Sequence, residues 1–264
     1  MNNIINMIEY GGYITFKDDE WLSNQRIAGK ILSDSHSMAK SMAVDGAETK
    51  NINNKIEEFI KDNNCTPTFK GYKGFPDALC TSVNKEIAHG VSSCDKVLKT
   101  GDVVKFDVGV SYEGAIADAA FTMSVGEFKN IRLKILSEAC RNALYRTIRY
   151  IEENIGKEPR VGDLGFIIKK GASNVGANVI KDLTGHGLEY EHPHWVPFIF
   201  NYGDKGKGAR LFPGMTICIE PMMVYGDGSI SIDSNGFSFL TKEIGVHFEH
   251  TIFIHEDRVE IITE

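Results

Sequence analysis

The chain has 264 residues, of which 42% are hydrophobic and 25% charged, a composition typical of one large globular domain or two small ones. Its formal net charge is -7, and an acidic chain is a poor general nucleic-acid binder because phosphate contacts need clustered Lys and Arg. Its five cysteines include no C-x-x-C pair, which argues against a disulfide framework and against a Cys-rich zinc site.

The first 20 residues are polar and contain glycine, and we expect them to form an extension or a short hairpin ahead of a single domain at 21–264. They lack the basic region and the apolar run of a signal peptide. No window of the chain reaches the roughly 18 apolar residues that a membrane span needs. We therefore expect a cytoplasmic protein without a membrane segment.

Four segments have the periodicity of helices. They are residues 21–43, 51–61, 129–153 and 162–174. A loop rich in aromatic residues and glycine, FKGYKGFP (69–76), follows the second of them. The stretch 102–110 alternates apolar and polar residues around Asp107, which is typical of a strand, and a second strand is predicted to run through Asp118 to Met123.

Two acids of this predicted strand pair face each other. A turn at 111–114, centred between its second and third residues, places Asp107 directly opposite Asp118, with Cβ atoms roughly 4.5–5.5 Å apart on one face. Facing carboxylates repel each other unless a cation lies between them, and a divalent metal is the simplest such cation. Two exposed acids on a solvated strand are the alternative, and this pair alone leaves the two readings even.

Two more acids lie in strand contexts further along the chain. Glu220 ends the apolar run MTICI (215–219), and Glu249 precedes the run HTIFI (250–254). Carboxylates in such runs are rarely buried without a partner, and Lys105 alone is too little positive charge for four acids. These two positions favour a metal site over solvated acids.

An internal echo relates the first of these strands to a later one. LKTGDVVKFD (98–107) and LFPGMTICIE (211–220) each place a glycine after Leu-x-x and a carboxylate six residues after that glycine. Each copy follows two predicted helices. A chance match is the alternative, but the shared order favours a duplicated half-domain, whose halves would pair into one sheet and bring equivalent carboxylates together.

His186 lies between two glycines in TGHG (184–187), which removes Cβ bulk so that a metal or substrate can approach closely. Alone, a structural histidine would be the better reading, but beside four acids a nitrogen ligand is favoured. We therefore predict a metal site made by Asp107, Asp118, His186, Glu220 and Glu249. One imidazole with several carboxylates suits two divalent ions about 3.5–4 Å apart, such as Mn, Fe(II), Co or Zn.

Seven motifs stand in a characteristic order. They are QRIAGKIL (25–32), GYKGFPDALCTSVNKEIAHG (71–90), GDVVKFDVGV (101–110), TGHGL (184–188), HWVPFIFNY (194–202), PGMTICIEPM (213–222) and FEHTIFI (248–254). Together they resemble type I methionine aminopeptidases, metallopeptidases of the pita-bread fold. The resemblance implies an α+β fold of two pseudo-twofold-related helix–helix–hairpin halves, with a curved antiparallel sheet and the helices outside.

The resemblance also implies an activity and a role for each metal ligand. The catalytic domain at 21–264 would remove the N-terminal methionine from new proteins and peptides with a small second residue, by a hydroxide that two metals activate. Asp118 and Glu249 would bridge both ions. Asp107 would bind one ion only, and His186 with Glu220 would bind the other. Glu220 would also carry the proton from the attacking water to the leaving amine.

Two histidines are implied to face the substrate and to stabilise the tetrahedral intermediate. His89, within AHG (88–90), matches the first. His194 matches the second, because HWVP and the following NY have the family's spacing. His192 is the alternative for that role.

The pocket for the methionine side chain would use Tyr72, Phe75 and Cys80, with Phe237 opposite, because aromatic rings and a thiol suit a thioether. Plain core packing is the alternative for the first three.

The sequence departs from the family's pattern at Glu189, Trp195 and Phe237, where glycine, an acid and a tryptophan are usual. Residues 1–20 have no counterpart. These departures bear on the pocket and its rim and leave the metal site intact.

Two other functions remain open. A proline-directed aminopeptidase or dipeptidase of the same fold usually carries a separate N-terminal domain, for which the stretch before Asp107 leaves too little room. A catalytically inactive binding module typically loses metal ligands, whereas all five positions here keep a donor. We expect a monomer whose one candidate for a transient ribosome contact is KGKGAR (205–210), although a solvated loop is the favoured reading of that stretch.

Overall fold

The computed structural model describes residues 4–7, 11–190 and 192–264. Over these residues the α-helices are α1 (Asp19–Met42), α2 (Thr49–Asp62), α3 (Ile131–Glu153) and α4 (Val161–Ser173). Their ends lie within two residues of the predicted ones. The side chain of Asp18 caps α1 by accepting from Trp21 N, which fixes where that helix begins. In this described part of the chain, no helix is long and apolar enough to cross a membrane.

The strands pair antiparallel throughout the described residues. They are β1 (Ile4–Met7), β2 (Gly12–Thr15), β3 (Thr66–Pro67), β4 (Leu79–Val83), β5 (Glu86–Ala88), β6 (Val103–Tyr112), β7 (Ala115–Ser124), β8 (Asn178–Val179), β9 (Thr184–Glu189), β10 (His192–Phe200), β11 (Thr216–Ile219), β12 (Met222–Val224), β13 (Ile230–Ile232), β14 (Phe239–Thr241), β15 (Gly245–His247), β16 (His250–Ile254) and β17 (Val259–Ile261). β6 pairs with β3, β4 and β7, and the order β10–β9–β11–β16–β17 forms a second sheet. Smaller sheets have the orders β15–β12–β8, β13–β14–β5 and β1–β2.

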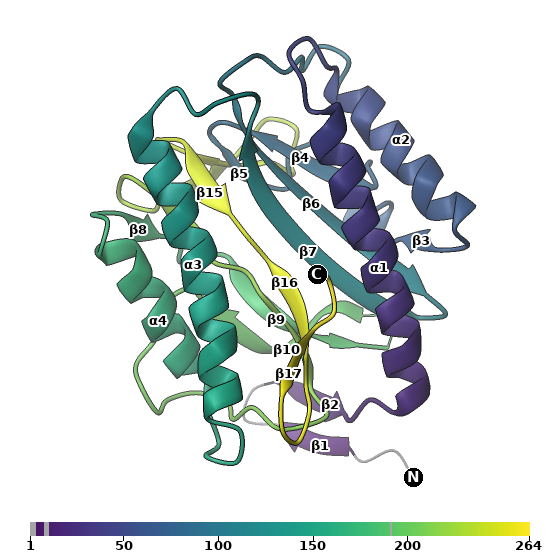
Figure 1. The fold of residues 1–264 in the computed structure, drawn as a ribbon, viewed down its shortest axis with the longest axis vertical. Helices are drawn as coiled ribbons and strands as arrows, with labels where there is room; N and C mark the ends of the chain where they lie inside the picture. Colours follow the sequence, from purple (N-terminus) through teal and green to yellow (C-terminus); the bar gives the residue numbers. More distant parts are fainter. Residues whose placement is uncertain (1–3, 8–10, 191) are drawn as a thin grey trace.

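The two halves of the molecule meet where β7 runs beside β16 (Figure 1). Ala120 N donates to Glu249 O at 3.4 Å, and Glu249 N donates to Ala120 O at 2.8 Å. The Thr251 hydroxyl accepts from Asp118 N at 2.9 Å and donates to Asp118 O at 2.7 Å. These bonds fix the backbones of two predicted metal ligands side by side.

The helices cover one face of these sheets (Figure 1). α1 and α2 pack in one core with apolar residues of β6 such as Phe106 and Val108. α3 and α4 pack in another with Ile217 of β11 and Ile252 of β16. Because side chains alternate along a strand, Asp107 points to the opposite face, away from the helices. This is the predicted arrangement of two halves with their helices outside.

In each half, a turn with the same glycine conformation precedes the central strand. Gly101 and Gly214 have φ values of 89° and 88°, a left-handed conformation that favours glycine. Asp107 and Glu220 each follow six residues later. The internal echo therefore marks equivalent backbone positions, as a duplicated half-domain predicts.

The predicted register of the β6–β7 hairpin is wrong, because the observed turn lies one residue later and each strand partner is shifted by two residues. Tyr112 pairs with Ala115, so the turn is the two residues Glu113 and Gly114, both with positive φ. Such a turn matches the right-handed twist of the strands. Asp107 consequently pairs with Ala120 and not with Asp118. The two acids still share one face, as diagonal neighbours on the hairpin.

The N-terminal segment forms the hairpin of β1 and β2, and β2 packs against β10. Glu189 accepts from Thr15 N at 2.9 Å and pairs with Lys17 Nζ at 2.6 Å. Both side chains of this ion pair are almost fully buried. Trp195 Nε1 donates to Tyr13 O at 2.6 Å. Two departures from the family's pattern, at Glu189 and Trp195, thus serve to dock residues 12–17.

Removing one partner of this buried pair leaves an uncompensated charge. We expect Lys17→Met or Glu189→Gln to lower the free energy of unfolding by about 3–5 kcal/mol. Urea denaturation of the metal-free protein measures it. The double variant should recover much of the loss, and Lys242→Met, which breaks the exposed pair with Asp227, should leave the midpoint unchanged. Equal midpoints for all four variants and the parent would contradict a structural role for the pair.

Candidate metal centre

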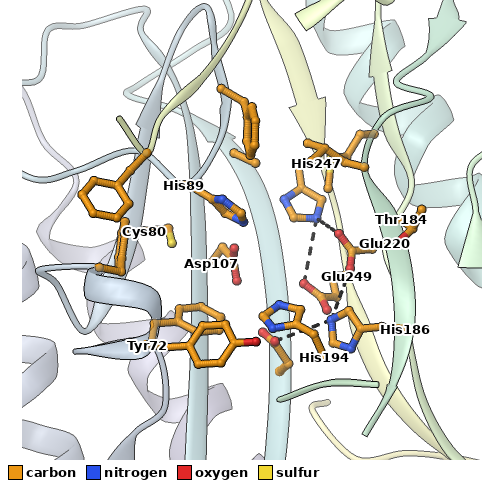
Figure 2. A pocket seen from close by; sticks show the side chains of 18 of the residues that line it. Tyr72, Cys80, His89, Asp107, Thr184, His186, His194, Glu220, His247 and Glu249 are labelled. Atoms are coloured by element: carbon orange, nitrogen blue, oxygen red, sulfur yellow. Dashed lines mark ion pairs between the residues drawn. The ribbon is translucent and has the colours of Figure 1, made fainter. Parts of the chain in front are cut away.

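A cavity of about 500 Å³ opens on the face of the sheets away from the helices (Figure 2). Every site residue predicted from the sequence lines it: Tyr72, Phe75, Cys80, His89, Asp107, Asp118, His186, His194, Glu220, Phe237 and Glu249. His192 does not line it. The fold therefore gathers into one place side chains that are far apart in the chain.

Each predicted ligand comes from a central strand or from the residue next to one. Asp107 lies on β6, Asp118 on β7 and His186 on β9. Glu220 follows the last residue of β11, and Glu249 precedes the first of β16. Sites built on strands hold their side chains more precisely than sites on loops.

The four carboxylates are buried without a protein cation. None of them is more than 9% exposed. Across residues 4–7, 11–190 and 192–264, no Lys or Arg forms an ion pair with any of them. Lys105 points elsewhere, because its Nζ donates to Asn84 O at 2.7 Å. To be ionised together, these acids therefore need a cation from outside the chain.

Unpaired oxygens show where such a cation would bind. Asp107 Oδ1, Asp118 Oδ1 and Glu249 Oε1 are buried and have no hydrogen-bond partner among the described residues. Buried polar atoms in folded proteins almost always have a hydrogen-bond partner. Several unpaired oxygens that face one cavity therefore indicate a ligand that the chain does not supply. Carboxylate oxygens beside a neutral imidazole are a donor set that divalent metals take. The residues present fit the group that the resemblance implies.

The pKa values of these side chains reflect the burial of several carboxylates without a cation. Burial raises the pKa of Asp107 to about 7. Burial and then the neighbouring carboxylates raise the pKa values of Asp118, Glu220 and Glu249 well above their usual range. Burial lowers the pKa of His186 to about 4, which leaves its ring neutral and able to bind a metal.

His186 lies against two of the acids. Its Nε2 is 3.4 Å from Glu220 Oε1 and 4.0 Å from Asp118 Oδ2. The flanking glycines serve a different purpose from the predicted one. A Cβ on Gly185 or Gly187 would collide with the backbone of a neighbouring strand, so these glycines allow close strand packing and do not open the way for a metal.

His247, which the sequence reasoning missed, joins the same cluster. It is 2% exposed, and its Nε2 lies 3.6 Å from Glu220 Oε2 and 3.9 Å from Glu249 Oε2 (Figure 2). With Glu220 and Glu249 it forms a group that could hold a metal ion. The available signal was its position two residues before Glu249, since residues i and i+2 of an extended chain share a face.

The two other histidines of the cavity flank the acids. His194 stacks on Tyr72 with ring centroids 5.3 Å apart, and its centroid is 4.5 Å from that of His186. His89 has a φ of 53°, a strained conformation for a residue with a Cβ. Burial lowers the pKa of both, so both rings are neutral hydrogen-bonding groups. His192 is exposed and stacks on Trp195, which favours His194 for the second substrate-facing position.

An apolar side pocket adjoins the acids. Phe75 and Phe237 meet edge to face with ring centroids 5.6 Å apart. With Phe69 and Cys80 they form a small cluster separate from the two main cores. These side chains line a cavity as well as packing together, which favours the substrate-pocket reading over plain core packing.

Comparison with known proteins places the chain and its fold in a family. The profile of metallopeptidase family M24 matches residues 23–256. A methionine aminopeptidase of Mycoplasma capricolum is 39% identical over 253 residues, which are 95% of this chain and 98% of that protein. The crystal structure of a methionine aminopeptidase from Thermotoga maritima is 36% identical with a TM-score of 0.89, and the match covers 94% of this chain and 98% of that one.

The chain therefore belongs to metallopeptidase family M24, and within it to the methionine aminopeptidases. A prolidase from Pyrococcus furiosus has the same fold, with a TM-score of 0.71. It is only 22% identical, and the match covers 65% of its length, so that likeness extends to the fold alone.

The raised pKa of Asp107 has a consequence for the metal-free protein. Its pKa in the fold, about 7, exceeds the ordinary 3.8, so the fold binds the proton more tightly than the unfolded chain does. Stability of the metal-free protein should therefore fall as the pH rises from about 4 to 7, and metal should restore it. Asp107→Asn, which cannot ionise, should raise the melting temperature of the metal-free protein at pH 7.5 by several degrees and lower that of the metal-saturated protein.

Thermal melts with and without excess Mn²⁺ check both signs, with the exposed Asp95→Asn as the matched control. A variant that is less stable than the parent in both states would contradict the account of unneutralised charge.

Proposed function

We propose that this protein removes the N-terminal methionine from peptides and newly made proteins whose second residue is small, with two divalent metal ions at the acid cluster. The observation that carries the proposal is one cavity that joins four buried, unneutralised acids to an aromatic side pocket. The methionine aminopeptidases that match nearly the whole chain support it. The apolar pocket of Phe75, Cys80 and Phe237 would take the methionine thioether.

Asp107, Asp118, His186, Glu220 and Glu249 would hold the metals. When bound, the metals would polarise the peptide carbonyl and lower the pKa of the attacking water. Their charge would also reverse the raised pKa values of the acids, so that the carboxylates are ionised at neutral pH. Mn, Fe, Co and Zn all suit this set of donors.

The chain's own groups would guide the proton and the substrate. Glu220 would accept the proton of the attacking water and pass it to the leaving amine. His89 and His194 would donate hydrogen bonds to the peptide and stabilise the negative oxygen of the tetrahedral intermediate. Tyr72, stacked on His194, would hold that ring in position.

A proline-directed peptidase is disfavoured because the prolidase is only 22% identical to this chain, against 39% and 36% for two methionine aminopeptidases. An inactive binding module is disfavoured because all the predicted metal ligands meet in one cavity.

We place the activity in the cytoplasm, where new chains begin with methionine. The stretch 205–210 is a poor docking site for the ribosome, because Arg210 pairs with Glu158 and Gly206 N donates to Asp163 Oδ1. The solvated-loop reading of this stretch is favoured.

Metal removal and Asp107→Ala should each abolish the release of methionine from Met-Ala-Ser. Added Mn²⁺ or Co²⁺ should restore the chelated parent and should fail to restore the variant. The exposed Asp95→Ala is the control and should keep its activity. Full activity of Asp107→Ala, or faster cleavage of Xaa-Pro substrates than of Met-Ala-Ser, would overturn the proposal.

The two histidines of β10 offer a matched pair. His194→Asn should lower kcat/KM for Met-Ala-Ser by about 10²–10³-fold, the loss typical of one donor to a tetrahedral intermediate. His192→Asn removes an exposed ring outside the cavity and should leave kcat/KM close to that of the parent. Steady-state kinetics decide between them, and the reverse order of effects would assign the role to His192.

A further inference from the structure

His247 is a buried histidine with no hydrogen-bond partner for its ring. Both Nδ1 and Nε2 are buried, and neither finds a donor or an acceptor among the described residues. A neutral imidazole normally has one nitrogen that donates and one that accepts. An orphaned ring that is 2% exposed and faces the cavity therefore indicates a bound partner that the chain itself does not supply.

The distances around His247 suit a shared metal better than a hydrogen bond. Its Nε2 lies 3.6 Å from Glu220 Oε2 and 3.9 Å from Glu249 Oε2, beyond the roughly 2.7–3.2 Å of a good hydrogen bond. Two donors that each lie about 2.0–2.2 Å from one ion are themselves roughly 3.0–3.6 Å apart. The distance to Glu220 Oε2 falls within this range, and the distance to Glu249 Oε2 is slightly longer. His186, the predicted nitrogen ligand, is 3.4 Å from the other oxygen of Glu220. His247 thus approaches Glu220 much as His186 does, from the opposite oxygen (Figure 2).

The backbone of His247 is held in place, so the ring lies where the fold puts it. His247 pairs with Met222 in the β12–β15 ladder. Its N donates to Thr122 Oγ1 at 2.9 Å, and the Thr122 hydroxyl donates to its O at 2.6 Å. Thr122 belongs to β7, the strand that carries Asp118. The ring is therefore tied to the same framework as the acids.

We propose that His247 is a further metal ligand, which binds through Nε2 an ion that Glu220 and Glu249 also hold. The inference rests on the proposed metal centre and adds a second nitrogen donor to it. Imidazole favours Zn, Co and Fe over Mn, whereas carboxylate favours Mn. The second imidazole should therefore shift the metal preference of this chain away from Mn²⁺ and towards Zn²⁺.

The test counts metal-bound histidines without using activity. In the Co(II)-loaded protein, each ligating histidine gives one strongly shifted ring N–H proton resonance that disappears on exchange into D₂O. We expect two such resonances in the parent and one in His247→Gln, which keeps a polar side chain of similar length. The matched control is His194→Gln, which removes another ring of the cavity and should keep both. His247→Gln should also weaken Zn²⁺ binding at least about tenfold, with a smaller loss for Mn²⁺.

The outcomes separate this inference from the proposed function. A single shifted resonance in the parent, retained in His247→Gln, would overturn the inference and leave the metal centre intact. No shifted resonance at all would overturn the metal centre as well. If His247→Gln does not fold, the number of resonances in the parent decides by itself.

Discussion

The burial of four carboxylates in one cavity is the constraint on which this structure depends. Backbone bonds between Ala120 and Glu249, and bonds from the Thr251 hydroxyl to the Asp118 backbone, hold Asp118 and Glu249 beside each other. The two acids therefore cannot relieve their repulsion by moving apart. Without a cation these two acids keep their protons, because their pKa values are raised well above the usual range. A divalent ion favours the ionised form of the acids instead of the protonated form. Metal binding, proton release and stability are therefore coupled in this protein.

The duplicated architecture explains why the acids meet. Each half contributes a glycine turn, a central strand and a carboxylate six residues after the glycine, and the halves join where β7 runs beside β16. The helices are all on the other face, which leaves the inner face free for the cavity. The N-terminal segment stabilises this arrangement, because the buried Lys17–Glu189 pair holds it against the β9–β10 ladder that carries His186 and His194.

The sequence predicts the helices and the strand carrying Asp107 because periodicity is a local signal. It predicts the convergence of the acids because the internal echo relates two distant strands that each carry one. The hairpin register was wrong because it depends on whether Glu113 accepts a left-handed conformation, which propensity does not decide. His247 was missed because a histidine near the end of an apolar strand is equally typical of a packed core. Only the packing of β15 against β12 and β7 shows that its ring faces the acids of the cavity.

The central claim is that divalent ions neutralise the acid cluster, and anomalous X-ray scattering from crystals soaked in Mn²⁺ or Co²⁺ tests it most directly. Data collected at the absorption edge of the metal locate each ion without reference to activity. If the claim holds, two anomalous peaks lie between Asp107, Asp118, His186, Glu220 and Glu249. Crystals that contain the metal elsewhere, with this cavity filled only by water and protonated acids, would contradict it.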